Sequence, residues 1–363
     1  MNSRLCKIIV VCSWLALLLA SCAAPSPTPT LTPEPSLTPP PIPSATALPL
    51  PTATLAPVKL RVLMLPFLSF APFQIADEEG YFADQGLEIE FVRIDNTDDT
   101  VPLLAQGQLD VASGPLRVSM LNAMAEGLNI KFVADRGYVD AQGCPYTAIM
   151  ARRELVDQGL LSDVAQIKGR RLDVNRVFLE GYWIEQWLAT AGLSFKDVEL
   201  MNIQPALELE ALKTGQVDVT ISSEPWVTRI VEDGGGVLWV PIQDVMPGKQ
   251  FAFVLFGRSL LEGNRDAGNR FMVAYLQGVR QYNEGKTQRN LDLMAKFSGL
   301  DRQLLMDSCW IPIRSDGSVT LQGVFDYQDW AVAKGYANGG VTAEQCWDGS
   351  FIAYANQVLG PAQ

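Results

Sequence analysis

The chain has 363 residues, of which 48% are hydrophobic and 19% charged, and this composition supports a large core arranged as one bilobal unit or two domains. Its net charge of -12 argues against a nucleic-acid partner, because phosphate binding needs a basic surface. The sequence has no histidine, which excludes Ser-His-Asp and Cys-His catalytic arrangements and removes the most common metal ligand. We therefore expect no metal site and no cofactor.

Residues 1–21 have the pattern of a secretory signal peptide. Arg4 and Lys7 supply the positive start, and residues 8–20 form an apolar run that is short for a bilayer span. The run closes with Leu-Ala-Ser-Cys, which matches the bacterial lipobox and predicts cleavage and lipidation at Cys22. An uncleaved anchor helix is the alternative. In either case, the sequence predicts a protein held at the outer side of the cytoplasmic membrane.

Residues 22–57 read as a lipidated cysteine followed by a tether. From position 23 onward this segment contains 12 prolines and 10 serines or threonines, with Glu34 as its only charge. Such a composition buries too little apolar surface to offset the entropy of ordering, and its prolines favour an extended chain. The folded part therefore begins near Val58.

From Val58 onward, strands and helices alternate in a way that predicts an α/β fold with mainly parallel sheets. The first predicted group has strands over 59–65, 87–94, 110–113 and 130–134 with helices over 72–79, 97–106 and 120–126. Residues 146–151 are another strand candidate, and the second group has strands over 171–174, 198–202 and 217–222 with helices over 182–192 and 205–214. A strand over 251–257 could return the chain to the first group, and the remainder reads mostly as helix.

One phrase occurs in both groups. Residues 103–111 read Leu-Leu-Ala-Gln-Gly-Gln-Leu-Asp-Val, and residues 212–219 read Leu-Lys-Thr-Gly-Gln-Val-Asp-Val. Each copy ends a helix at glycine and enters a strand two or three residues later. Two copies about a hundred residues apart predict two similarly built lobes, and a ligand commonly binds between two such lobes.

With these two copies, Gly-Tyr-Phe-Ala-x-x-Gly-Leu at 80–87, Lys-Gly-Arg at 168–170 and Leu-x-x-x-Gly-Leu at 188–193 complete a set of motifs. In order and spacing the set resembles the sulfonate/nitrate/taurine and thiamine-pyrimidine-precursor group of ABC-importer solute-binding proteins. The resemblance implies a type II periplasmic-binding fold with two hinge crossings, lobe 1 over 58–150 and 251–363, and lobe 2 over 151–250. It also implies a monomer that delivers a small solute to ABC permease and ATPase subunits, without catalysis.

Ligand contacts in this group fall on a few loops, and the matching loops here contain aromatic and small polar residues. The predicted ligand-binding residues are Phe67, Ser69, Phe70, Ser113, Gly114, Tyr138, Phe178, Glu180, Gly181, Tyr182, Glu224 and Trp226. Several lie after strands, at the edge where α/β sheets expose ligand sites. Core packing is the alternative role for the two phenylalanines before the first helix, and helix capping is the alternative for Ser113.

Glu180 shapes the expected ligand. A carboxylate repels an oxyanion but accepts from an amine or from ring N–H groups, and Trp226 and Tyr182 could stack on a flat ring. We therefore expect an aromatic or heterocyclic solute, such as a thiamine pyrimidine precursor or a flavin. A small oxyanion (alkanesulfonate, taurine or nitrate) is the alternative, and Arg136 favours it because a guanidinium can receive an anion. A first-turn helix role is the alternative for Glu180.

Two further function classes stay open at this point. A surface sensor could use the same cleft, and an enzyme related to the pyrimidine synthases shares the fold, although the lack of histidine argues against the enzyme. Among the cysteines, the sequence predicts a disulfide between Cys309 and Cys346 in an oxidising compartment, with Cys144 left over.

Overall fold

The computed structural model describes residues 57–94 and 97–362. The predicted signal peptide, the lipidation site Cys22 and the tether up to residue 56 lie outside the described residues. No helix within the described ranges combines the length and the apolar character needed to cross a membrane.

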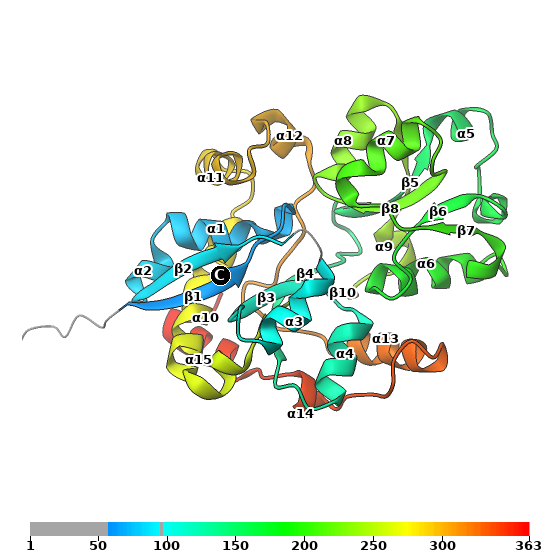
Figure 1. Ribbon diagram of the computed structural model, residues 1–363. Helices are drawn as coiled ribbons and strands as arrows, with labels where there is room; N and C mark the ends of the chain where they lie inside the picture. Colours follow the sequence, from blue (N-terminus) through cyan, green and yellow to red (C-terminus); the bar gives the residue numbers. More distant parts are fainter. Residues whose placement is uncertain (1–56, 95–96, 363) are drawn as a thin grey trace, which may run out of the picture. The chain divides into compact units, whose positions relative to one another are not determined.

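Two five-stranded sheets form the centre of the fold (Figure 1). The first has the order β2-β1-β3-β10-β4, with β1 (Val58–Leu63), β2 (Leu87–Val92), β3 (Val111–Pro115), β4 (Lys131–Tyr138) and β10 (Gln250–Phe256). Strand β1 runs parallel to β2 and β3, whereas β10 is antiparallel to both of its neighbours. The late strand returns the chain to the first sheet, as predicted.

The second sheet repeats this plan. Its order is β7-β6-β8-β5-β9, with β5 (Thr147–Arg152), β6 (Arg171–Asp173), β7 (Glu199–Met201), β8 (Val219–Ser223) and β9 (Gly236–Pro241). Again three strands are parallel and the fourth in order, β5, is antiparallel to its neighbours. Strand β5 belongs to this sheet, although we expected the first lobe to extend to residue 150.

Helices connect and flank the strands (Figure 1). Those before β10 are α1 (Ala71–Glu78), α2 (Tyr81–Asp84), α3 (Thr100–Ala105), α4 (Val118–Ala125), α5 (Arg153–Asp157), α6 (Leu179–Ala189), α7 (Glu208–Lys213), α8 (Trp226–Asp233) and α9 (Ile242–Val245). Those after it are α10 (Arg265–Tyr282), α11 (Gln288–Ser298), α12 (Arg302–Asp307), α13 (Gln322–Ala333), α14 (Ala343–Cys346) and α15 (Ser350–Leu359). Helix α6 begins before the predicted residue 182, so Glu180 and Gly181 lie in its first turn.

The repeated phrase forms the same contact in each sheet. Asp110 accepts from the backbone N–H of Arg61 on β1 at 2.8 Å and also pairs with its guanidinium. Asp218 binds the backbone N–H of Arg171 on β6 at 3.0 Å and its guanidinium in the same manner. Both aspartates are buried at the start of a strand. The motif therefore ties the start of one strand to its parallel neighbour in each sheet.

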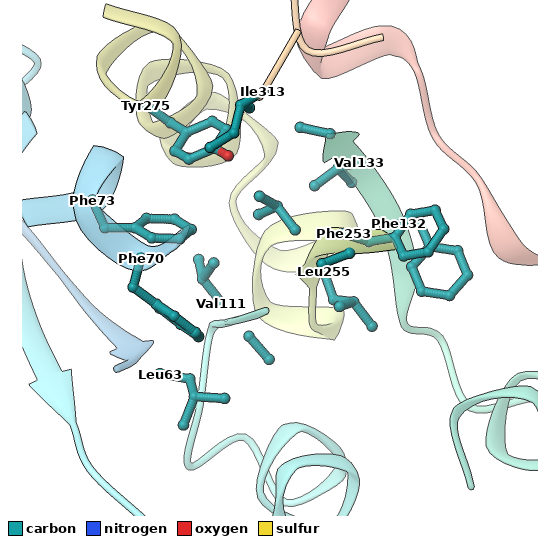
Figure 2. Packing of buried hydrophobic residues seen from close by; sticks show 14 of the residues in the cluster. Leu63, Phe70, Phe73, Val111, Phe132, Val133, Phe253, Leu255, Tyr275 and Ile313 are labelled. Carbon is teal, nitrogen blue, oxygen red and sulfur yellow. The ribbon is translucent and has the colours of Figure 1, made fainter. Parts of the chain in front are cut away.

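Aromatic rings pack the first sheet against α1 and α10 (Figure 2). Phe73 on α1 lies 4.8 Å from the ring of Tyr275 on α10, and Phe132 on β4 lies 4.2 Å from Phe253 on β10. The C-terminal helices α10 and α15 thus belong to this core, as the family resemblance implied.

Two segments, residues 139–146 and 242–249, connect the first sheet to the second. They lie side by side, since Val139 donates to the carbonyl of Lys249 and Gly248 donates to the carbonyl of Val139, each at 2.8 Å. These are the two hinge crossings that the fold class predicts.

A disulfide joins one crossing to the C-terminal region, but with a different partner from the predicted one. Cys309 bonds to Cys144, whereas Cys346 is a free, buried thiol. The Cys309–Cys346 prediction is wrong because α14, which carries Cys346, packs on β4 and α4, while Cys309 follows α12, which packs on α11 and α8.

Peptide mapping of the purified, unreduced protein should recover Cys144 linked to Cys309. Because the bond closes a loop of 165 residues, Cys309→Ser should lower the free energy of unfolding by about 2–5 kcal/mol in a denaturant titration. Cys346→Ala, the control, should leave the linked peptide intact. A linked peptide that contains Cys346 would contradict this pairing.

Candidate functional site

Loops from the two sheets meet directly at the carboxyl ends of their parallel strands. Residues 116–118, after β3, pair in antiparallel fashion with residues 177–179 at the start of α6. Val118 donates to the carbonyl of Val177 at 3.2 Å, and Leu179 donates to the carbonyl of Leu116 at 2.9 Å. This pairing brings side chains from both sheets to one place, where α/β folds commonly bind ligands.

Arg136, near the end of β4, is the first charged group at this junction. It is only 2% exposed, and its guanidinium lies 4.4 Å from the ring centroid of Phe70. One terminal nitrogen donates to the hydroxyl of Ser69, which also accepts from the Tyr146 hydroxyl at 3.0 Å. Its Nε is buried without a hydrogen-bond partner, and no carboxylate of the described residues forms an ion pair with it.

Arg117, the residue before α4, is the second charged group at the junction. It is also 2% exposed, and its guanidinium lies 4.4 Å from the ring centroid of Phe178. Nη1 donates to the carbonyl of Thr97 at 2.6 Å and lies 3.9 Å from a carboxylate oxygen of the exposed Asp98, while Nε is buried without a partner. A Cβ on Gly114 would lie 3.3 Å from Nη2, so this guanidinium passes over the glycine backbone.

Glu180, in the first turn of α6, is the third charged group. Its Oε2 is buried without a hydrogen-bond partner. Burial raises the pKa of the Glu180 carboxyl, and the positive charges of Arg117 and Arg136 oppose this rise. The next residue must be small, because a Cβ at Gly181 would lie 2.7 Å from the backbone of Arg176.

The charges of these three groups do not balance. Burial lowers the pKa of the Arg117 and Arg136 guanidinium groups. The charges of Glu180 and Asp98 oppose this change at Arg117, and interactions with Tyr146, Tyr275, Asp135 and Glu180 oppose it at Arg136. Taking a charge out of water is costly unless it is paired, and among the described residues only the exposed Asp98, 3.9 Å from Arg117, forms an ion pair with either of these two arginines. Guanidinium groups bind planar oxyanions through paired N–H donors. The arrangement is therefore suited to binding an anion.

Asp135, beside Arg136 in sequence, forms its ion pair with Arg314, although its charge also opposes the effect of burial on the pKa of Arg136. Its carboxylate accepts from the backbone N–H groups of Gly137 and Arg314, each at 2.7 Å, and from the Gln250 side chain at 2.6 Å. Asp135 therefore joins β4 to β10 and to the C-terminal segment.

Several predicted ligand-binding residues make structural contacts instead of facing the arginines. The Ser113 hydroxyl donates to the carbonyl of Phe253 at 2.9 Å, and Tyr138 lies under the guanidinium of Arg314, 4.2 Å from its ring centroid. Tyr182 packs against Trp330 of α13, with 5.4 Å between ring centroids. These contacts join secondary-structure elements of the fold.

Glu224 and Trp226 lie at the start of α8. Glu224 accepts from the Thr228 backbone N–H and hydroxyl and from the Cys309 backbone N–H at 2.9 Å. The guanidinium of Arg229 lies 5.0 Å from a ring centroid of Trp226, whose Nε1 is buried without a partner. Glu224 thus holds the disulfide segment against the second sheet. Phe67 precedes the turn of Ser69 and is partly exposed.

Sequence reasoning missed Arg117 and Tyr146 and treated Arg136 only as counterevidence. Arg117 stands between Leu116 and Val118, and this single charge inside an apolar stretch was the available signal. Within the described ranges, no group of three or more acidic or sulfur-bearing side chains is arranged to hold a metal ion.

The second sheet contains a separate buried acidic pair. Glu208, the first residue of α7, is 4% exposed and bonds to the hydroxyl of Ser222, and Asp173 accepts from Thr220 at 2.8 Å. Burial raises the pKa of the Glu208 carboxyl well above its usual value, and the neighbouring Asp173 adds to this rise. Glu208 is therefore protonated over a wider pH range than a solvated glutamate.

Comparison with solved structures finds the same fold in two binding proteins and in one enzyme. The nitrate-binding protein NrtA from Synechocystis PCC 6803 superimposes with a TM-score of 0.69 at 16% identity over 84% of this chain and 90% of NrtA. The alkanesulfonate-binding protein SsuA from Xanthomonas axonopodis pv. citri superimposes with a TM-score of 0.65 at 18% identity, over 80% of this chain and 98% of SsuA. The desulfurization enzyme DszB superimposes with a TM-score of 0.61 at 14% identity, over 83% of this chain and 99% of DszB.

The fold is thus the two-lobed periplasmic-binding type. Residues 53–297 match the NMT1-like family model, and the chain belongs to this family. The bicarbonate-binding protein CmpA from Synechococcus elongatus is 26% identical over 193 residues, which covers 47% of this chain. The chain spans 42% of CmpA, less than half of that relative's length.

The buried Glu208 generates a pH prediction. A raised pKa in the folded state stabilises the fold below the unfolded value of about 4.5, and this contribution is lost as the pH rises through the folded pKa. Glu208→Gln should therefore become more stable relative to the wild type between pH 5 and pH 8, by at least about 1 kcal/mol. Urea titrations across this range measure the difference, and a constant difference would contradict the assignment.

Proposed function

We propose that this protein is the extracytoplasmic solute-binding component of an ABC importer and that it carries a small oxyanion. The ligand binds to the guanidinium groups of Arg136 and Arg117, where the loops of the two sheets meet. The protein delivers the solute to permease and ATPase subunits, and the lipid on Cys22 holds it at the membrane surface. The lobes expected around 58–150 with 251–363 and around 151–250 move about the two crossings.

The buried Arg136 is the observation that carries this proposal. A buried guanidinium whose hydrogen-bond acceptor is a serine hydroxyl, and whose Nε has no partner, retains donors for a further acceptor. An oxyanion supplies both the missing charge and the missing acceptors. Arg117 lies close enough for its charge to interact with that of Arg136, so both can contribute to one anion.

The relatives agree with this ligand class. CmpA is a bicarbonate-binding protein, NrtA binds nitrate and SsuA binds alkanesulfonates, and all three ligands are small oxyanions. The expected heterocyclic solute, of the thiamine-precursor or flavin type, has less support. The expectation of a heterocyclic solute relied on Glu224 and Tyr182. In the structure, Glu224 binds the disulfide segment and Tyr182 packs on α13.

DszB shows that this fold also supports catalysis, so the fold alone does not decide between binding and chemistry. The junction of Arg117, Arg136 and Glu180 favours binding, because its two guanidinium groups offer the charge and the hydrogen-bond donors that an anion requires. The sensor hypothesis shares the same ligand and differs only in the membrane partner.

Replacing Arg136 tests the proposal. The wild-type protein should gain thermal stability with millimolar bicarbonate, nitrate or an alkanesulfonate, measured by differential scanning fluorimetry. Arg136→Gln should weaken binding of the stabilising anion at least about tenfold, because it removes charge-assisted hydrogen bonds.

Arg280→Gln is the matched control. Arg280 lies on α10 and donates to backbone carbonyls of the C-terminal segment, so its loss should lower the melting temperature and leave the anion-induced shift unchanged. Stabilisation by a pyrimidine or flavin and by none of the three anions would refute the oxyanion assignment.

A further inference from the structure

Glu180 presents a chemical difficulty for an anion site, because a carboxylate lies beside the two arginines. Its Oε2 is buried and has no hydrogen-bond partner, and the backbone N–H of Glu180 itself contributes a hydrogen bond to the carboxylate. The carboxylate forms no ion pair with Arg117 or Arg136 within the described residues, although its charge interacts with both. One acceptor atom is therefore buried among donors that it does not contact.

An anion bound to both guanidinium groups comes close to this carboxylate. A nitrate or a simple alkanesulfonate offers only acceptor oxygens and brings like charge against Oε2, which is unfavourable. An anion with a hydroxyl or ammonium group donates a hydrogen bond to Oε2 while its other oxygens bind the arginines. The buried acceptor is then satisfied.

We propose that Glu180 makes this site select oxyanions that carry their own hydrogen-bond donor over oxyanions that carry none. This inference rests on the proposed function, since it requires an anion on Arg136 and Arg117. The donor is either a hydroxyl, as in bicarbonate, or an ammonium, as in an aminoalkanesulfonate. Glu180 is thus a specificity-determining residue, and the arginines supply the general affinity for anions.

A structural role does not account for this arrangement. A glutamate in the first helical turn stabilises the helix dipole while its carboxylate stays in solvent. Glu180 instead has one oxygen atom fully buried, and its charge interacts with those of Arg117 and Arg136. By contrast, Glu185 on the same helix accepts from Trp330 and Lys334 of α13, each at 2.7 Å. The two carboxylates of α6 therefore differ, and Glu180 is the one left with an unused acceptor.

Two matched ligand pairs test the selection on the intact protein by isothermal titration calorimetry at one fixed pH. Bicarbonate and nitrate are both small planar anions, but bicarbonate alone has a hydroxyl donor. Taurine and propane-1-sulfonate have similar length, but taurine alone has an ammonium group. A charge-assisted hydrogen bond predicts about 10- to 100-fold tighter binding of the donor-bearing member in at least one pair. The pair that shows this preference identifies the donor as hydroxyl or ammonium.

Glu180→Gln should reduce that preference to within about threefold, because the amide removes the negative charge and offers donors of its own. Glu208→Gln is the matched control, since it makes the same change at a buried carboxyl of the acidic pair in the second sheet, and it should keep the wild-type preference. The melting temperature of each variant without ligand checks that both are folded.

The remaining outcomes separate the two proposals. If no anion binds, or if Arg136→Gln binds as the wild type does, the proposed function fails and the selection by Glu180 fails with it. If nitrate and propane-1-sulfonate bind as tightly as their partners, the oxyanion function stands and the selection is refuted. A preference that survives in Glu180→Gln refutes the assignment to this residue.

Discussion

Each sheet depends on one buried aspartate that binds the backbone and the guanidinium of an arginine on the neighbouring parallel strand. Asp110 and Asp218 make this contact directly before β3 and β8, where it holds strand order and register. Loops and the first turns of helices lie at the carboxyl ends of these strands. Because both sheets are built in this way, their carboxyl edges supply the residues that meet at Arg117, Arg136 and Glu180.

The junction between the sheets combines backbone hydrogen bonds with buried guanidinium groups that have unused hydrogen-bond donors. Antiparallel pairing of residues 116–118 with 177–179 fixes the position of the two loops. Helix α13 adds a contact through the Tyr327 hydroxyl, which donates to the carbonyl of Val177 at 2.5 Å. Between these supports lie two buried guanidinium groups, each with an Nε that has no hydrogen-bond partner, so a bound anion improves the electrostatics of the folded protein.

The elements of the fold were predictable to a large extent. Strand β10 could be read from a run of apolar residues and α1 from Pro72 at its start, because local pattern and backbone preference decide such elements. The site was predictable only in part. Four of the predicted residues lie at the junction: Ser69, Phe70, Phe178 and Glu180. Glu224 and Tyr182 instead contact the distant C-terminal region, where Glu224 binds the disulfide segment and Tyr182 packs on α13.

The sequence by itself determined the two α/β units, the return of β10 to the first sheet and the family resemblance, because glycine, aspartate and hydrophobic periodicity act over a few residues. The tertiary structure decided which charges are buried together and which cysteines pair. Arg117, Arg136 and Glu180 come from three separate elements, and Cys144 and Cys309 are 165 residues apart. Their proximity depends on how the sheets and the C-terminal helices pack, which no local pattern encodes.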